Sequence, residues 1–207
     1  MKIIIAAVLL LAQFAVAGPA SATLVDFSDM QETIDITQAI NPAGYSASGV
    51  TFSYDDFGSG VDFATVDSFG IFGTTPGVLL LDFATPSTAL NLNFSLLEAV
   101  LADPQTGQIP DALTVLFFRA GNMSDFTSAS ADFQANDPGD LTLGFATGAL
   151  AYSGLSFDHA ELYFSTDAPF FTVDNVSYQP VPEPTSFVLL ALGLLVLGSW
   201  RYYRRRC

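Results

Sequence analysis

The middle of this 207-residue chain contains almost no basic residues. Between residues 23 and 180, Arg119 is the one basic side chain, whereas twenty Asp and Glu side chains lie in the same range. The net charge of this middle segment is therefore −19 at neutral pH. The composition excludes nucleic-acid binding, because contacts to phosphates need Lys and Arg, and it disfavours anionic lipid surfaces for the same reason.

Two explanations fit so acidic a segment. Divalent cations are its natural counter-ions, and Ca²⁺ prefers carboxylate oxygens, so a structural Ca²⁺ ion is one expectation. Alternatively, the negative charge only keeps the protein soluble. In either case we expect Arg119 to pair with one of the carboxylates.

Cysteine and histidine are also scarce. The one cysteine, Cys207, is the last residue, so the middle segment has no disulfide and depends on its hydrophobic core for stability. A single histidine does not make a usual zinc site. His159 has Asp158 and Glu161 nearby, but the chain lacks the Gly-x-Ser-x-Gly sequence of many Ser-His-Asp enzymes. We therefore expect a surface histidine at the start of a strand.

Residues 1–22 have the features of a secretory signal peptide. Lys2 supplies the positive start, and Ile3–Ala17 is the apolar segment that follows it. Cleavage is expected after Ala22, because Gly and Pro directly after the apolar segment end its helix, with cleavage after Ala17 as the alternative.

A second apolar stretch, Phe187–Trp200, lies near the C-terminus. Together with its flanking residues it approaches the roughly 30 Å of a bilayer core, so we expect a single transmembrane helix. Four arginines follow it, namely Arg201, Arg204, Arg205 and Arg206. By the positive-inside rule the arginine tail stays in the cytoplasm and the middle segment is exported across the inner membrane. The predicted organisation is a signal peptide over 1–22, an exported domain over 23–180 and a membrane tail over 181–207.

Short runs in which apolar and polar residues alternate recur through the middle segment, and Leu90–Leu96 is the clearest of them. The other runs are Gly49–Tyr54, Val78–Phe83, Leu113–Phe118, Leu141–Phe145, Glu161–Ser165 and Phe171–Tyr178. About ten short strands separated by turn residues predict an all-β domain, a two-sheet β-sandwich of jelly-roll type. Leu96–Ala102 is expected to form a helical turn, and Met30–Ala39 a loop or a strand.

The C-terminal segment carries a recognisable order of elements. Pro182, Glu183 and Pro184 come first, the apolar span follows, and the arginines end the chain. This order resembles the PEP-CTERM sorting signal, which is recognised by exosortase, a membrane-embedded protease or transpeptidase. The resemblance implies that exosortase binds and cleaves this tail, and that the exported protein reaches the cell surface or the extracellular matrix of bacteria that make exopolysaccharide. The prolines suit such a site, because they hold the segment extended.

The middle segment is similar, more loosely, to jelly-roll domains found ahead of such tails. Three stretches carry this similarity, namely Val25–Asp29, Gly44-Tyr45 with Gly49–Phe52, and Phe171–Tyr178. It implies that the first and last strands pair, and that Asp26 and Asp174 hold a structural Ca²⁺ ion. The alternative for Asp174 is a β-bulge with Asn175, in which both side chains face solvent.

These observations predict a cell-surface or matrix protein that is not an enzyme and has a structural or interaction role linked to exopolysaccharide or biofilm. A carbohydrate-binding module is the alternative, with sugar rings stacking on aromatic side chains such as Tyr45, Tyr54, Tyr152 or Tyr163. A glycoside hydrolase is a further alternative, because it needs only two suitably placed carboxylates.

Overall fold

The computed structural model describes residues 21–28, 30–100, 107–137 and 140–181, and for residues 140–142 the backbone alone. Pro182, Glu183, Pro184, the apolar stretch and the arginine tail lie outside the described residues, as does nearly all of the signal peptide. The domain boundaries and the transmembrane helix therefore stay predictions. In the ranges that are described, no helix is long and apolar enough to cross a membrane.

The described part of the chain is all-β, as its alternating sequence pattern predicts. Its strands are β1 (Thr23–Leu24), β2 (Ile34–Asp35), β3 (Tyr45–Ala47), β4 (Val50–Asp55), β5 (Ala64–Asp67), β6 (Gly70–Thr74), β7 (Val78–Val100), β8 (Gln108–Arg119), β9 (Asn122–Asp137), β10 (Asp140–Phe164) and β11 (Phe170–Pro180). Every pairing between these strands is antiparallel.

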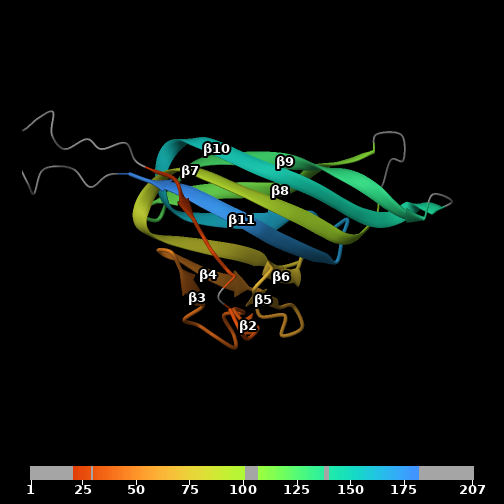
Figure 1. Cartoon of the computed structure of the whole chain (residues 1–207), viewed down its shortest axis with the longest axis horizontal. Coiled ribbons are helices and arrows are strands. Elements are labelled where there is room, and N and C mark those ends of the chain that lie inside the picture. The colour runs from red at the N-terminus through yellow and green to blue at the C-terminus, as the bar shows by residue number, and fades with distance from the viewer. Residues whose placement is uncertain (1–20, 29, 101–106, 138–139, 182–207) are drawn as a thin grey trace, which may run out of the picture. The chain divides into compact units, whose positions relative to one another are not determined.

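Two of the strands are much longer than the sequence predicts. β7 has 23 residues and β10 has 25, and they pair with each other along most of their length (Figure 1). Their pairing register shifts near Ser153 and Phe157, opposite the segment of β7 that contains Pro86 and Ser87. Such irregularities bend a strand, so β7 and β10 each pass from one layer of the structure into the other.

The two layers share β7 and β10, and also β9, whose residues 122–132 pair with β8 and whose residues 132–137 pair with β10. In layer 1, β4 pairs with residues 78–83 of β7, and residues 159–164 of β10 pair with β8. In layer 2, β11 pairs with residues 87–97 of β7, and residues 140–147 of β10 pair with β9. The predicted all-β sandwich is thus confirmed, and its two layers belong to one hydrogen-bonded sheet of eleven strands.

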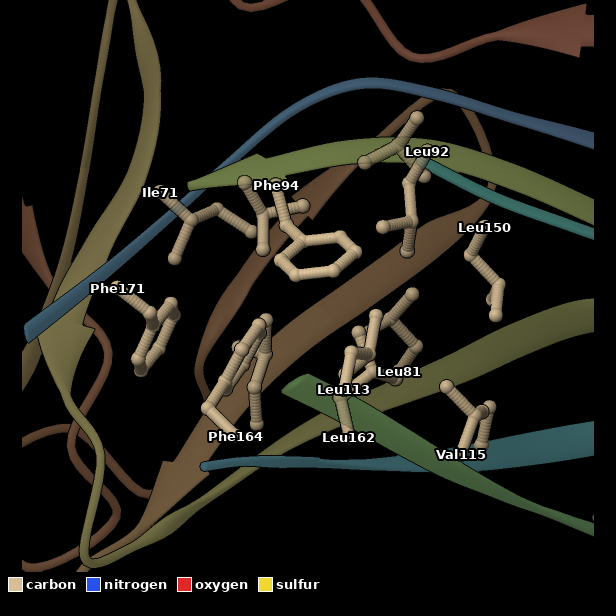
Figure 2. Close-up of a cluster of buried hydrophobic side chains, with 14 of the residues drawn as sticks. Ile71, Leu81, Leu92, Phe94, Leu113, Val115, Leu150, Leu162, Phe164 and Phe171 are labelled. Carbon is tan, nitrogen blue, oxygen red and sulfur yellow. The ribbon is translucent and has the colours of Figure 1, made fainter. Parts of the chain in front are cut away.

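The hydrophobic core lies between these layers. Figure 2 shows Phe94 of layer 2 pointing towards Leu113 and Leu162 of layer 1. The rings of Phe164 and Phe171 stack with centroids 3.9 Å apart and planes 6° apart, although their strands, β10 and β11, do not pair with each other. This ring stack holds together two strands that share no hydrogen bonds, so side-chain packing joins the two layers in the core.

The local predictions have mixed outcomes. The strand predicted over Leu90–Leu96 is confirmed, because these residues lie within β7. The helical turn predicted over Leu96–Ala102 is wrong, since Leu96–Val100 continues β7 and pairs with β10. Pairing of these residues with β10 outweighs their weak helical pattern.

Candidate functional site

Two rows on the outward side of layer 2 present short side chains, most of them polar. Register places Thr147, Ser95 and Thr172 in one row across β10, β7 and β11, and Ala149, Asn93 and Asp174 in the next row. The residues between them along each strand, such as Phe94, are buried, because successive side chains of a strand point to opposite faces. These two rows therefore lie directly above a closely packed core, whereas the adjoining row on the same face, made of Phe145, Leu97 and Phe170, is apolar.

Two adjoining depressions run across this face. The first has a volume of about 400 Å³, and it is lined by Asn93, Phe94, Ser95, Thr147, Gly148 and Asp174. The second has a volume of about 310 Å³, and it is lined by Leu24, Val25, Asp26, Phe27, Ser28, Ser68, Phe69, Asp174 and Asn175. Because Asp174 lines both, we treat them as one feature and name it the Asp174 groove. It spans strands β10, β7, β11 and β1.

Gly148 forms part of the floor of the groove. A Cβ atom at this position would overlap the ring of Phe94, which is its register partner on β7. It would also come within 2.7 Å of the carbonyl oxygen of Ser130. Glycine is therefore required here by close packing, and its missing side chain leaves room for the Phe94 ring beneath the groove.

The pairing of the first and last strands brings Asp26 and Asp174 to the same depression. Thr23 and Leu24 pair with Tyr178 and Ser177, and the amide of Val25 donates to the carbonyl oxygen of Val176. The strand pairing implied by the resemblance is thus confirmed. Asp26, which lies just beyond β1, accepts a 2.9 Å hydrogen bond from the amide of Ser28.

Asp174 and Asn175 form the β-bulge that the sequence offered as an alternative. The register between β11 and β7 shifts between Asp174 and Ser177, and Asn175 has φ +50°. Both side chains are exposed, and the Asn175 amide donates to Asp174 Oδ1 over 3.1 Å. Among the described residues, no group of three or more His, Cys, Asp or Glu side chains is placed to hold a metal ion. Calcium binding by Asp26 and Asp174 stays a prediction.

Hydrogen bonds lower the pKa of Asp26. The largest contribution comes from the side chain of Ser28, and the Ser28 backbone amide adds to it, since both favour the ionised carboxylate. Asp26 is therefore a stable negative charge at one end of the groove.

The exposed aromatic side chain that lines the groove is one that the sequence analysis did not select. Phe69, in the turn between β5 and β6, is 87% exposed, and Leu24 beside the same depression is also exposed. Tyr54 and Tyr152, which the sequence offered as sugar-stacking residues, are buried and so are wrong candidates. Exposure of a single turn residue depends on the tertiary fold, and no local pattern marks it.

The outward side of layer 1 differs, because its polar side chains are bonded to one another. His159 Nδ1 lies 2.7 Å from Asp82 Oδ1, and His159 Nε2 lies 3.6 Å from Glu161 Oε1. The hydroxyl of Tyr163 donates to Glu161 Oε2 over 2.7 Å. His159 lies inside β10 rather than at a strand start, so that part of the prediction is wrong.

Two other charged positions have structural roles. Arg119 forms an ion pair with Asp158 at 2.7 Å, as the sequence analysis expected for an arginine in so acidic a segment. Asp56 is buried, and its two carboxylate oxygens accept hydrogen bonds from the amides of Gly58 and Gly60. The hydrogen bond from Gly60, followed by that from Gly58, lowers the pKa of Asp56. This carboxylate therefore organises its own loop.

Comparison with known proteins identifies the C-terminal segment. Residues 180–206 match the PEP-CTERM protein-sorting motif, which confirms the resemblance seen in the sequence. The motif implies export, processing by exosortase and sorting to the cell surface. A comparison with curated proteins found no match.

The solved structures that are similar to this chain include the following three carbohydrate-binding modules. A family 29 carbohydrate-binding module from Piromyces equi has 10% identity and a TM-score of 0.42, covering 79% of this chain and 93% of that one. The xylan-binding module CBM15 has 11% identity and a TM-score of 0.40, covering 80% and 99%. A CBM4 structure has 12% identity and a TM-score of 0.39, covering 76% and 99%. Similarity at this level carries no information about the ligand of this chain.

Proposed function

We propose that this chain, whose residues 180–206 match the PEP-CTERM protein-sorting motif, is an exosortase-processed protein of the cell surface or matrix that binds exopolysaccharide along the Asp174 groove. The observation that carries the proposal is the position of a polar groove, bordered by an exposed aromatic ring, on a domain that precedes a sorting signal. The role is non-enzymatic and lies in structure or interaction, and the domain is a β-sandwich of jelly-roll type.

The chemistry of the groove suits a polysaccharide. Sugar hydroxyl groups both donate and accept hydrogen bonds, and the amide of Asn93, the hydroxyls of Ser95 and Thr147, and the carboxylate of Asp174 offer both functions. Phe69 supplies an apolar face against which a sugar ring can lie. An open groove also accommodates a polymer, because the chain can continue beyond each end of it.

The lowered pKa of Asp26 argues against this residue as the general acid of a glycoside hydrolase. A glycoside hydrolase needs one carboxylic acid whose pKa is raised so that it can protonate the leaving oxygen. The two carboxylates of the groove are Asp26 and Asp174, and the pKa of Asp26 is lowered by Ser28. This is the reverse of what a general acid requires.

The proposed location of the protein follows from its signal peptide and its C-terminal sorting segment. In our proposal, the signal peptide directs export, the Phe187–Trp200 helix holds the chain in the inner membrane, and the arginines stay in the cytoplasm. Exosortase then cleaves near Pro182–Pro184 and releases the domain to the surface. Replacing Glu183 and Pro184 with alanine is expected to leave uncleaved protein in the inner membrane, as fractionation and immunoblotting would show. Normal maturation of the double variant would contradict the sorting step.

Glycan binding is tested with the full-length protein, purified in detergent, on an array of bacterial and plant polysaccharides. The expected result is retention on at least one polysaccharide, together with loss of that retention when Asn93 is replaced by Trp to fill the groove. Retention that the Asn93→Trp variant preserves would place binding elsewhere, and the absence of retention on every polysaccharide would remove the proposed function.

A further inference from the structure

We infer that the Asp174 groove selects glycans that carry free amino groups, rather than neutral or uronic-acid glycans. This inference rests on the proposed function and specifies the ligand class for that same site. It follows from two observations: the charged side chains that line the groove are negative, and Arg119, the one basic side chain of the exported segment, is bonded to Asp158 on the other layer.

The charged side chains that line the groove are all negative. Asp174 lines both depressions, and Asp26 lines the second, where Asn175 and two serines are the remaining polar side chains. Each carboxylate has two oxygens with about four lone-pair positions in total, so the hydrogen bonds from Ser28 and Asn175 leave acceptor capacity on both. The groove therefore offers charged acceptors and no charged donor.

The single basic side chain of the exported segment does not serve the groove. Arg119 is at the end of β8, on the other layer, and its Nη1 is bonded to Asp158 Oδ2 at 2.7 Å. With twenty acidic residues against this one arginine, the field over the domain is strongly negative. A uronic-acid polymer would bring negative charge to two carboxylates without any cation to offset it.

An ammonium group has the complementary chemistry. It is a point charge with three donors, and it bonds carboxylates more strongly than a hydroxyl group does. Amino sugars without N-acetyl groups present such ammonium groups at regular intervals along the chain. The same sugar backbone with N-acetyl groups is neutral, so the two forms make a matched pair of probes that differ in charge at one atom.

The experiment compares three probes on the full-length protein in detergent, at mildly acidic pH where carboxyl groups of ordinary pKa remain ionised. The probes are an oligosaccharide of β-1,4-linked glucosamine, its fully N-acetylated form, and an oligo-uronate of equal length. The expected result is binding of the glucosamine form about tenfold tighter than the N-acetylated form, since each exposed ion pair supplies up to about a fivefold gain. High salt should remove most of this difference, because it screens exposed charges.

The variant that tests the assignment is Asp26→Asn with Asp174→Asn, which keeps the shape of both side chains. It is expected to bind the glucosamine form no more tightly than the N-acetylated form. The control is Asp111→Asn, which removes one charge at an exposed position that lines neither depression and should keep most of the preference. Circular dichroism of each variant confirms that the fold is retained.

The outcomes separate the inference from the proposed function. Equal binding of the two amino-sugar forms, or a preference that the double variant retains, would overturn the inference while leaving the groove as a glycan site. Preferred binding of the oligo-uronate, in the presence of Ca²⁺ or without it, would also overturn it. Binding of none of these probes or of any glycan on the array would remove both.

Discussion

The two halves of β7 belong to different layers and have different outward surfaces. In both halves alternate residues such as Leu81 and Leu92 are buried in the same core. In layer 1 the outward positions include Asp82, whose carboxylate is bonded to His159. In layer 2 they include Asn91 and Asn93, which are exposed, and Asn93 lines the groove. One strand thus contributes to a self-bonded face and to an open one.

The comparison shows that polarity alone does not make a binding surface. The side chains of Asp82, His159, Glu161 and Tyr163 bond one another, so a ligand would have to displace these contacts. The short side chains over the other half of β7 lie beside two depressions and have little bulk to cover them. Hydrogen-bonding capacity that faces solvent in a concave site is what a polar ligand can use.

The largest expected effect comes from breaking the core that both layers share. Phe164→Ala removes a ring that stacks on Phe171 across the layers, and it should lower the free energy of unfolding by about 3–5 kcal/mol. Urea denaturation of the full-length protein in detergent measures this loss. A loss near that of an exposed substitution, such as Ser130→Ala, would mean that the two layers are not stabilised by a common core.

A smaller loss of stability is expected from filling the space beneath the groove. Gly148→Ala adds a Cβ atom that overlaps the Phe94 ring, and overpacking of this kind costs about 1–3 kcal/mol of unfolding free energy. The matched control is Ala149→Ser at the next, outward-facing position, where the added atom meets solvent. If thermal melting showed the two variants to be equally stable, Gly148 would not be constrained by packing.

Filling the open face should affect binding rather than folding. Asn93→Trp places a large ring in the groove and should weaken polysaccharide binding by about tenfold or more, equivalent to about 1.4 kcal/mol. Thr114→Trp, at an outward position of layer 1, is the control and should leave binding unchanged. Calorimetric titration of both variants measures the affinities, and an equal loss in both would contradict the distinction between the faces.

The smallest expected effect concerns the bonded face at high pH. Burial, the hydrogen bond to Glu161 and the Glu161 charge together raise the pKa of Tyr163 to about 12. Because the unfolded chain ionises this tyrosine near pH 10, the free energy of unfolding falls as the pH rises from about 10 to 12. Glu161→Gln should lower the pKa of Tyr163 but keep it above the usual value, since burial remains.

A titration of phenolate absorbance follows this change. Tyr152 is an internal control, because burial and Asp125 raise its pKa to about 12 without a contribution from Glu161. An unchanged titration curve in the Glu161→Gln variant would show that Tyr163 and Glu161 are not bonded in solution.

Local sequence pattern predicted much of the fold. Alternation in Leu90–Leu96 placed these residues correctly in a strand, and the ion pair of Arg119 followed from its isolation among carboxylates. The length of β7 was not predictable in this way, because Pro86 interrupts the pattern and usually marks a strand end. β10 pairs with β7 on both sides of that position, at Asp82 and at Ser87, so the strand continues past the proline.

The candidate site was only partly predictable for a related reason. Asp26 and Asp174 line the same depression because the two ends of the exported segment pair, which a family resemblance suggested and no local pattern shows. The four tyrosines named from the sequence were chosen by residue type, and burial of Tyr54 and Tyr152 depends on contacts made far along the chain. Phe69 was not predicted as a binding residue, because no sequence pattern marks a single aromatic residue in a turn as exposed.

The central claim is that a glycan occupies the face of β10, β7 and β11 and leaves the face around His159 free. Amide hydrogen exchange of the full-length protein, with and without a polysaccharide that it binds, tests this directly. The account predicts slower exchange at residues 91–95, 147–149 and 174–175 in the bound state, and unchanged exchange at residues 159–163. Slower exchange at 159–163 with no change around Asn93 and Asp174 would contradict it and assign binding to the other layer.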